Sequence, residues 1–143
     1  MRNHGLVIDF HNHFYPTTYL DDVRAGPSNV RFTLDTDGNP VLHYPGDYNV
    51  VVPGHRDITH RTSTLEEHGV DCQVLTFTSP GTHVEPPDRA VQLARSVNDA
   101  FAEIVAAHAG RFTALATLPL NAPQAAALEL ERAMTELHMP GAM

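Results

Sequence analysis

The chain has 143 residues, which suits a single ordinary domain, and 42% of them are apolar, which is enough for a sizeable core. Lys and Arg together number 9 against 17 Asp and Glu, so the formal net charge is −8; there are ten histidines and no lysine. This acidic balance argues against a nucleic-acid partner, because binding to a phosphate backbone depends on basic side chains. The chain shows no long apolar leader and no run approaching the ~20 apolar residues of a membrane span, so we expect a soluble, cytoplasmic protein without a membrane partner.

The first predicted element is a buried strand over residues 5–11, which begins with an apolar run. A polar, turn-rich region follows from Pro16 to His60. Within it, residues 30–44 predict a hairpin, because Asp37-Gly38 is a strong turn signal between two apolar segments. We interpret residues 28–52 as a small β insertion on a larger fold.

Further βα units are predicted over residues 57–143. A helix over 58–68 would be capped by Asp57 and ended by Gly69. The near-continuous apolar run 70–78 predicts the second strand. It contains Cys72, the only cysteine; no internal disulfide is possible, and we expect a buried, inert thiol.

The clearest helix covers residues 88–110, with Asp88 at the capping position and Gly110 at the end. Its apolar positions follow one helical face: Ala94, Val97, Phe101, Ile104, Val105 and His108. Residues 111–118 predict a third strand.

A last helix is predicted over residues 121–141, where Asn121 and Gln124 resemble a capping box. Its expected apolar stripe consists of Ala127, Leu130, Met134 and Leu137. A fourth strand should begin at 141–143. Strands that alternate with helices predict an α/β fold built from parallel βαβ units.

Two histidines, His11 and His13, stand one residue apart at the end of the first strand. Residues two apart in a strand share a face, so both imidazoles should project together, with Asp9 on the same face one step deeper. Such a pair can donate two ring nitrogens to a divalent metal, and functional residues of parallel α/β folds lie at these strand ends. The pair predicts a metal site, although this spacing also arises by chance in a histidine-rich chain.

The segment IDFHNHFYP resembles the opening signature of the amidohydrolase superfamily, and more narrowly of the amidohydrolase-related branch that includes aminocarboxymuconate-semialdehyde decarboxylase. Residues 61–80 and 97–143 are similar, in register, to that branch's next strands and helices. The resemblance implies the N-terminal portion of a metal-dependent (β/α)₈ TIM barrel with a small β-hairpin insertion. It implies His11 and His13 as metal ligands, and Asp9 as a support for the strand end or a ligand.

The resemblance also implies one divalent ion, expected to be zinc, with manganese, iron or cobalt also suitable. The family's further ligands, two histidines and an aspartate, would lie beyond Met143. A full barrel needs about 250 residues. We therefore expect a partial gene product, or one piece of a larger assembly.

The decarboxylase-like members are expected to hold a substrate carboxylate with an arginine near the insertion. Arg56 is close to that place in a shifted register, and Arg61 matches the family's helix pattern, where a structural role is equally plausible. His83 follows the second strand and could approach the metal or a substrate, although a solvated loop residue is the simpler interpretation.

These features predict a metal-dependent hydrolase or decarboxylase acting on a small carboxylate, lactone or amide-like substrate. The alternative is an inactive truncated remnant, or an interaction module that keeps half the barrel. Exposed sheet edges would favour a homo-oligomer or a complementing chain. A dinucleotide-binding fold is weaker, because no Gly-rich turn follows the first strand.

Overall fold

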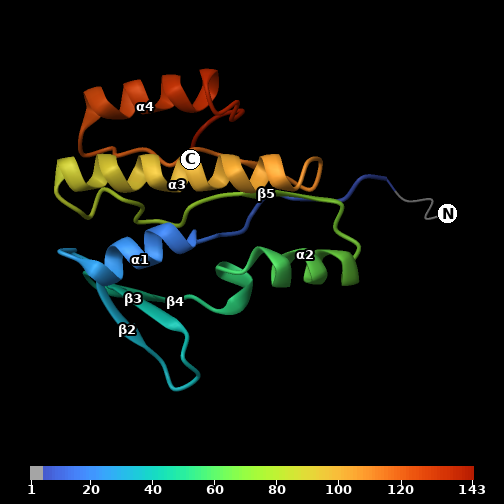
Figure 1. Cartoon of the computed structure of the whole chain (residues 1–143), viewed down its shortest axis with the longest axis horizontal. Helices are drawn as coiled ribbons and strands as arrows, with labels where there is room; N and C mark the ends of the chain where they lie inside the picture. Colours follow the sequence, from blue (N-terminus) through green and yellow to red (C-terminus); the bar gives the residue numbers. More distant parts are fainter. Residues whose placement is uncertain (1–4) are drawn as a thin grey trace.

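The computed structural model describes residues 5–143 and contains two separate sheets (Figure 1). The parallel sheet has the order β1 (Ile8–Asp9), β5 (Cys72–Leu75) and β6 (Phe112–Ala114). A parallel bridge between Ala116 and Ala142 continues this order, as expected for the start of a fourth strand. The predicted parallel α/β architecture is therefore confirmed over the described part of the chain.

The second sheet is an antiparallel meander of β2 (Arg31–Leu34), β3 (Pro40–Tyr44) and β4 (Asp47–Val50). The β2–β3 turn is closed by the Asp35 carboxylate, which accepts hydrogen bonds from the backbone N–H groups of Asp37 and Asn39 at 2.9 and 2.8 Å. The predicted turn at Asp37-Gly38 thus lies between two paired strands, and a third strand joins them. In Figure 1 this sheet projects from the side of helix α1, away from helix α4.

Helix α1 (Thr17–Ala25) was not predicted, because its polar residues resemble a turn-rich segment. Its signals are nevertheless in the sequence. Pro16 precedes the helix, Gly26 follows it with φ of 62°, and its apolar residues share one buried face: Tyr19, Leu20 and Val23. This face lies in the main hydrophobic core.

Helix α2 (Ile58–Glu67) follows the short 3₁₀ helix η1 (Pro53–His55) and confirms its predicted cap. The Asp57 carboxylate accepts hydrogen bonds from the backbone N–H groups of Thr59 and His60 at 2.9 and 3.0 Å. Helix α3 (Pro87–Ala107) buries the expected Ala94, Val97 and Phe101.

The start of α3 differs from the prediction. Pro86 is its N-cap residue, whereas Asp88 lies in the first turn, where its charge suits the helix dipole. Pro87 occupies the first helical position, where a missing N–H carries no penalty.

Helix α4 (Pro123–Thr135) corrects two further predictions. There is no capping box, because Ala122 is the N-cap residue and the Asn121 amide donates instead to the Glu85 carbonyl at 2.7 Å. The buried face consists of Ala126, Glu129 and Ala133, whereas Ala127 and Met134 of the expected stripe are exposed. The buried face of α4 has Glu129 at its centre and therefore does not coincide with the face that the apolar residues predict.

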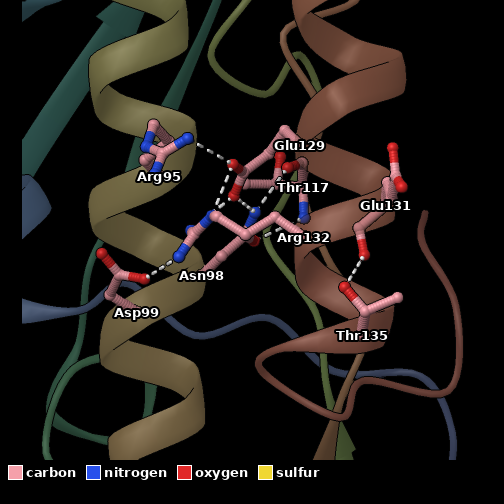
Figure 2. Close-up of polar contacts among 8 residues, drawn as sticks. All are labelled: Arg95, Asn98, Asp99, Thr117, Glu129, Glu131, Arg132 and Thr135. Atoms are coloured by element: carbon pink, nitrogen blue, oxygen red, sulfur yellow. Dashed lines mark hydrogen bonds and ion pairs between the residues drawn. The ribbon is translucent and has the colours of Figure 1, made fainter.

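Helices α3 and α4 are joined by a polar cluster around Glu129, whose side chain is only 2% exposed (Figure 2). Its carboxylate accepts from the Asn98 amide at 2.8 Å and from Arg132 at 2.7 and 2.9 Å. The Asn98 side chain also bonds both backbone groups of Thr117, just beyond β6. The cluster therefore fixes both helices and the loop that follows a parallel strand.

The first strand is shorter and more exposed than predicted. Pairing of β1 with β5 stops at Asp9 and Gln73, and Leu6 and Phe10 are 73% and 70% exposed. The Cys72 thiol, expected to be buried, is only half-buried. Within residues 5–143 no helix combines the length and apolar character needed to cross a membrane.

Candidate metal-binding site

The imidazoles of His11 and His13 lie together just beyond the end of β1. Their ring centroids are 5.5 Å apart, with the ring planes at 75°. Two imidazoles that share one zinc ion, with Zn–N distances of ~2.0–2.1 Å, place their ring centres about 5 Å apart. The two rings are therefore close enough to share one ion, and their role as metal ligands stays a prediction from the sequence.

The surroundings of His13 favour a neutral ring with a free Nε2. The Thr76 hydroxyl donates to the Asn12 carbonyl, so its oxygen can accept the Nδ1 hydrogen of His13, which lies 3.3 Å away. Burial lowers the pKa of His13, and the neighbouring His11, His55 and Arg61 lower it further. A neutral imidazole with one nitrogen held by a hydrogen bond is the form that binds a metal.

The segment that carries the two histidines is contacted by the guanidinium of Arg61, a residue that is 6% exposed. It donates to the Asn12 side-chain oxygen at 2.6 Å, the Gln73 side-chain oxygen at 3.0 Å and the His13 carbonyl at 2.6 Å. A further bond from Nε reaches the Gly54 carbonyl at 2.7 Å. Burial lowers the pKa of Arg61 to about 10, which still leaves it charged at neutral pH.

Asp9 is the last residue of β1, and the face that it is expected to share with the two histidines stays a prediction. Its carboxylate accepts from the Gln73 amide at 2.6 Å, on the side of the sheet where Arg61 lies. Asn12, three residues later, reaches the same Arg61. Residues three apart in a regular strand point to opposite faces, so the backbone leaves strand geometry after Asp9. Asp9 does accept from the backbone N–H of His11 at 3.0 Å, which braces the segment.

The other two predicted substrate residues lie in different places. Arg56 donates to the Asn39 side chain and the Val51 carbonyl, at 3.3 and 2.8 Å, and lines a groove of about 590 Å³ between α1, β2 and the start of α2. His83 is exposed and lines a small hollow of about 130 Å³ with Thr78, Thr117 and Met143. That hollow lies beyond the ends of β5 and β6.

Among residues 5–143, no group of three or more His, Cys, Asp or Glu side chains is arranged to hold a metal ion. His11 and His13 would therefore supply only two donors, whereas a catalytic metal site usually has at least three protein ligands. Sequence reasoning missed the parts played by Asn12, Gln73 and Thr76. Of these three residues, only Asn12 could have been identified from the sequence, because it stands between the two histidines.

Comparisons with known proteins bear on this arrangement. No family model matches the chain. Gamma-resorcylate decarboxylase of Rhodococcus jostii is 39% identical over 84 residues, which cover 58% of this chain and 26% of that protein. The 2-amino-3-carboxymuconate-6-semialdehyde decarboxylase of Dictyostelium discoideum is 37% identical over 84 residues, covering 57% of this chain and 23% of that protein.

Among solved structures, a dihydroxybenzoic acid decarboxylase from Polaromonas sp., with bound manganese and the inhibitor 2-nitroresorcinol, is 31% identical with a TM-score of 0.70. The match covers 97% of this chain and 38% of that one. The chain thus spans about a quarter of the length of these curated relatives, at 26% and 23%. The resemblance found in the sequence is confirmed at the level of these relatives: the chain is similar to gamma-resorcylate and 2-amino-3-carboxymuconate-6-semialdehyde decarboxylases over one part of their length.

Proposed function

We propose that the protein carrying this chain is a metal-dependent carboxy-lyase that removes carbon dioxide from a hydroxybenzoate. The observation that carries the proposal is the paired, partly preorganised imidazoles of His11 and His13 in a chain homologous to gamma-resorcylate decarboxylases. In this reaction the bond between the ring carbon and the carboxylate breaks, carbon dioxide leaves, and the ring carbon takes up a proton.

We also propose that the parallel sheet is the first part of a (β/α)₈ barrel. The strand order β1-β5-β6 and the bridge to Ala142 support this, as does the similarity to a decarboxylase structure more than twice as long. The exposed apolar residues of β1 would then be covered by strands and helices outside residues 5–143. The alternative of an inactive remnant or an interaction module gains no support from the relatives.

His11 and His13 are the residues that would hold the metal. A bound divalent ion would act as a Lewis acid and orient an oxygen-rich substrate. The related Polaromonas structure contains manganese, which supports a divalent ion; zinc remains our prediction from the sequence. Thr76 would keep the His13 Nδ1 hydrogen in place, and Asp9 would hold the His11 backbone.

The substrate would enter from the ends of the parallel strands, near the hollow beside His83. His83 is exposed there and is a candidate to meet its polar groups. Arg56 is a weaker candidate, because its guanidinium already donates to Asn39 and Val51.

The test is a decarboxylation assay on the complete protein with 2,6-dihydroxybenzoate, the substrate named for a related Rhizobium enzyme. Product is measured by chromatography, with and without added Mn²⁺ or Zn²⁺. We expect metal-dependent loss of the carboxylate. Hydrolysis of a lactone or amide panel without any decarboxylation would replace this proposal with the hydrolase interpretation.

Metal content provides the second part of the test. The double variant His11→Ala/His13→Ala should retain no metal by elemental analysis and show no activity. The matched control is His68→Ala/His108→Ala, which removes two histidines near the C-terminal ends of α2 and α3. Unchanged metal content in the first variant would refute the assignment of both ligands.

A further inference from the structure

The segment that carries the two histidines is not held by a regular strand ladder. Pairing of β1 with β5 ends at Asp9 and Gln73, before either histidine. The next main-chain bond of this segment is from the Phe14 N–H to the Thr76 carbonyl at 2.9 Å, and between Asp9 and Phe14 the chain is held largely by side chains. The Asn12 amide donates to the Val74 carbonyl at 2.7 Å, and Thr76 donates to the Asn12 carbonyl. The positions of the imidazoles therefore depend on what these side chains bind.

Arg61 is at the centre of these contacts. Its guanidinium donates to the Asn12 side-chain oxygen and to the His13 carbonyl, at 2.6 Å each. It is anchored in turn to the Gly54 carbonyl and to Gln73, at 2.7 and 3.0 Å. One planar group thus joins the histidine segment to β5 and to the chain before α2.

The positive charge of the buried Arg61 is balanced by protein groups and not by solvent. The Gln73 amide donates to the Asp9 carboxylate at 2.6 Å while its oxygen accepts from Arg61, so Gln73 links the two charged groups. The Arg61 guanidinium also lies 5.1 Å from the centre of the Phe14 ring, within range of a cation–π contact. Asp9 contacts the His11 backbone, so the same cluster fixes both histidines.

We infer that Arg61 is a positioning residue for the metal site: it fixes the segment from His11 to His13 so that the two imidazoles can bind a single ion. The inference rests on the proposed metal-binding function. The sequence left open whether Arg61 binds a substrate carboxylate or has a structural role, and the inference assigns it the structural role. Four of its N–H groups already have protein acceptors and it is buried, so little remains with which to bind a substrate carboxylate.

The experiment measures Mn²⁺ affinity by titration calorimetry on the complete protein. The variants are Arg61→Gln, which removes the charge and most donors, and Arg61→Lys, which keeps the charge but not the planar fork. We expect Mn²⁺ affinity to fall roughly 10–100-fold in both variants, the range found when a residue that orients metal ligands without touching the metal is replaced. Arg56→Gln is the matched control, because that arginine contacts only Asn39 and Val51 in the bonds described above, and it should keep wild-type affinity.

Circular dichroism checks that each variant is folded at the temperature of the titration. If Arg61→Gln does not fold, a second variant still tests the inference. Asn12→Ser keeps Arg61 but shortens the side chain whose oxygen accepts from Arg61 between the two histidines, and it should also weaken Mn²⁺ binding. Wild-type affinity in Arg61→Lys or in Asn12→Ser would overturn the inference, as would an equal loss in Arg56→Gln. Wild-type Mn²⁺ binding by His11→Ala/His13→Ala would instead refute the proposed function, so the two failures are distinguishable.

Discussion

Replacing Glu129 by alanine tests whether the polar cluster between α3 and α4 stabilises the fold. The carboxylate is buried and accepts three hydrogen bonds, from Asn98 and twice from Arg132 (Figure 2). Arg95 lies 3.4 Å from one of its oxygens. A hydrogen bond to a charged group contributes about 1.5–3 kcal/mol, and breaking a buried ion pair costs about 3–5 kcal/mol.

The expected loss is smaller than the sum of these contributions, because the partners keep other acceptors. Asn98 still donates to the Thr117 carbonyl, and Arg132 still donates to Asp99 at 2.7 Å. We therefore expect Glu129→Ala to lower the free energy of unfolding by about 2–4 kcal/mol, and Glu129→Gln by about half as much.

Urea unfolding followed by circular dichroism provides the measurement. The matched control is Glu131→Ala, two residues along the same helix, whose exposed side chain should matter by no more than about 0.5 kcal/mol. The same glutamate-to-alanine change in helix propensity applies to both variants. A loss below about 0.5 kcal/mol for Glu129→Ala, or an equal loss for Glu131→Ala, would refute the reasoning.

The same cluster predicts a pH dependence. Burial alone would raise the pKa of Glu129, but hydrogen bonds from Arg132 and Asn98, with the charges of Arg132 and Arg95, outweigh it and hold the pKa below the ordinary value of 4.5. The folded state therefore favours the ionised carboxylate, and this stabilisation is present above pH 4.5 and lost as the pH falls through the lower folded pKa. The stability difference between wild type and Glu129→Gln should shrink in that acidic range; a difference that grows there would contradict the assignment.

Two further predictions concern the core and a helix cap. Phe101→Ala should lower the free energy of unfolding by about 3–5 kcal/mol, because the ring is fully buried beside Phe14. Urea unfolding measures this loss, and a value under about 1 kcal/mol would show that neighbouring side chains fill the cavity. Asp57→Ala should cost about 1 kcal/mol through loss of the α2 cap, whereas Asp57→Asn should cost much less; equal losses in thermal unfolding would argue against the cap.

Local sequence signals predicted the repeating part of the fold well. Asp57 caps α2 as expected, and the apolar runs around Cys72 and Phe112 form neighbouring parallel strands. These elements are set by residues close to one another in the chain. Helix α1 could also have been found from Pro16 and Gly26, but its acidic and threonine residues masked the apolar face.

Predictions failed where partners distant in sequence decide the outcome. The buried face of α4 is centred on a glutamate whose burial depends on Asn98, on another helix. The Asp9 carboxylate is held by Gln73, 64 residues away, which local spacing does not reveal. The proximity of His11 and His13 was predictable from their spacing, but the hydrogen bonds of Arg61 to Asn12 and to the His13 carbonyl were not.

The way β1 is attached has a consequence for the order in which the chain opens. Only two of its residues pair with β5, across a separation of 64 residues, whereas β5 and β6 pair at three positions. Segments with few ladder bonds and much solvent contact open locally at a lower free energy than the global unfolding transition. Amide hydrogen exchange should therefore be faster at Cys72, whose N–H donates to Val7, than at Leu115, whose N–H donates to Leu75. An ion bound by His11 and His13 would slow exchange at Cys72 first, because ligands that bind only the closed state suppress its opening.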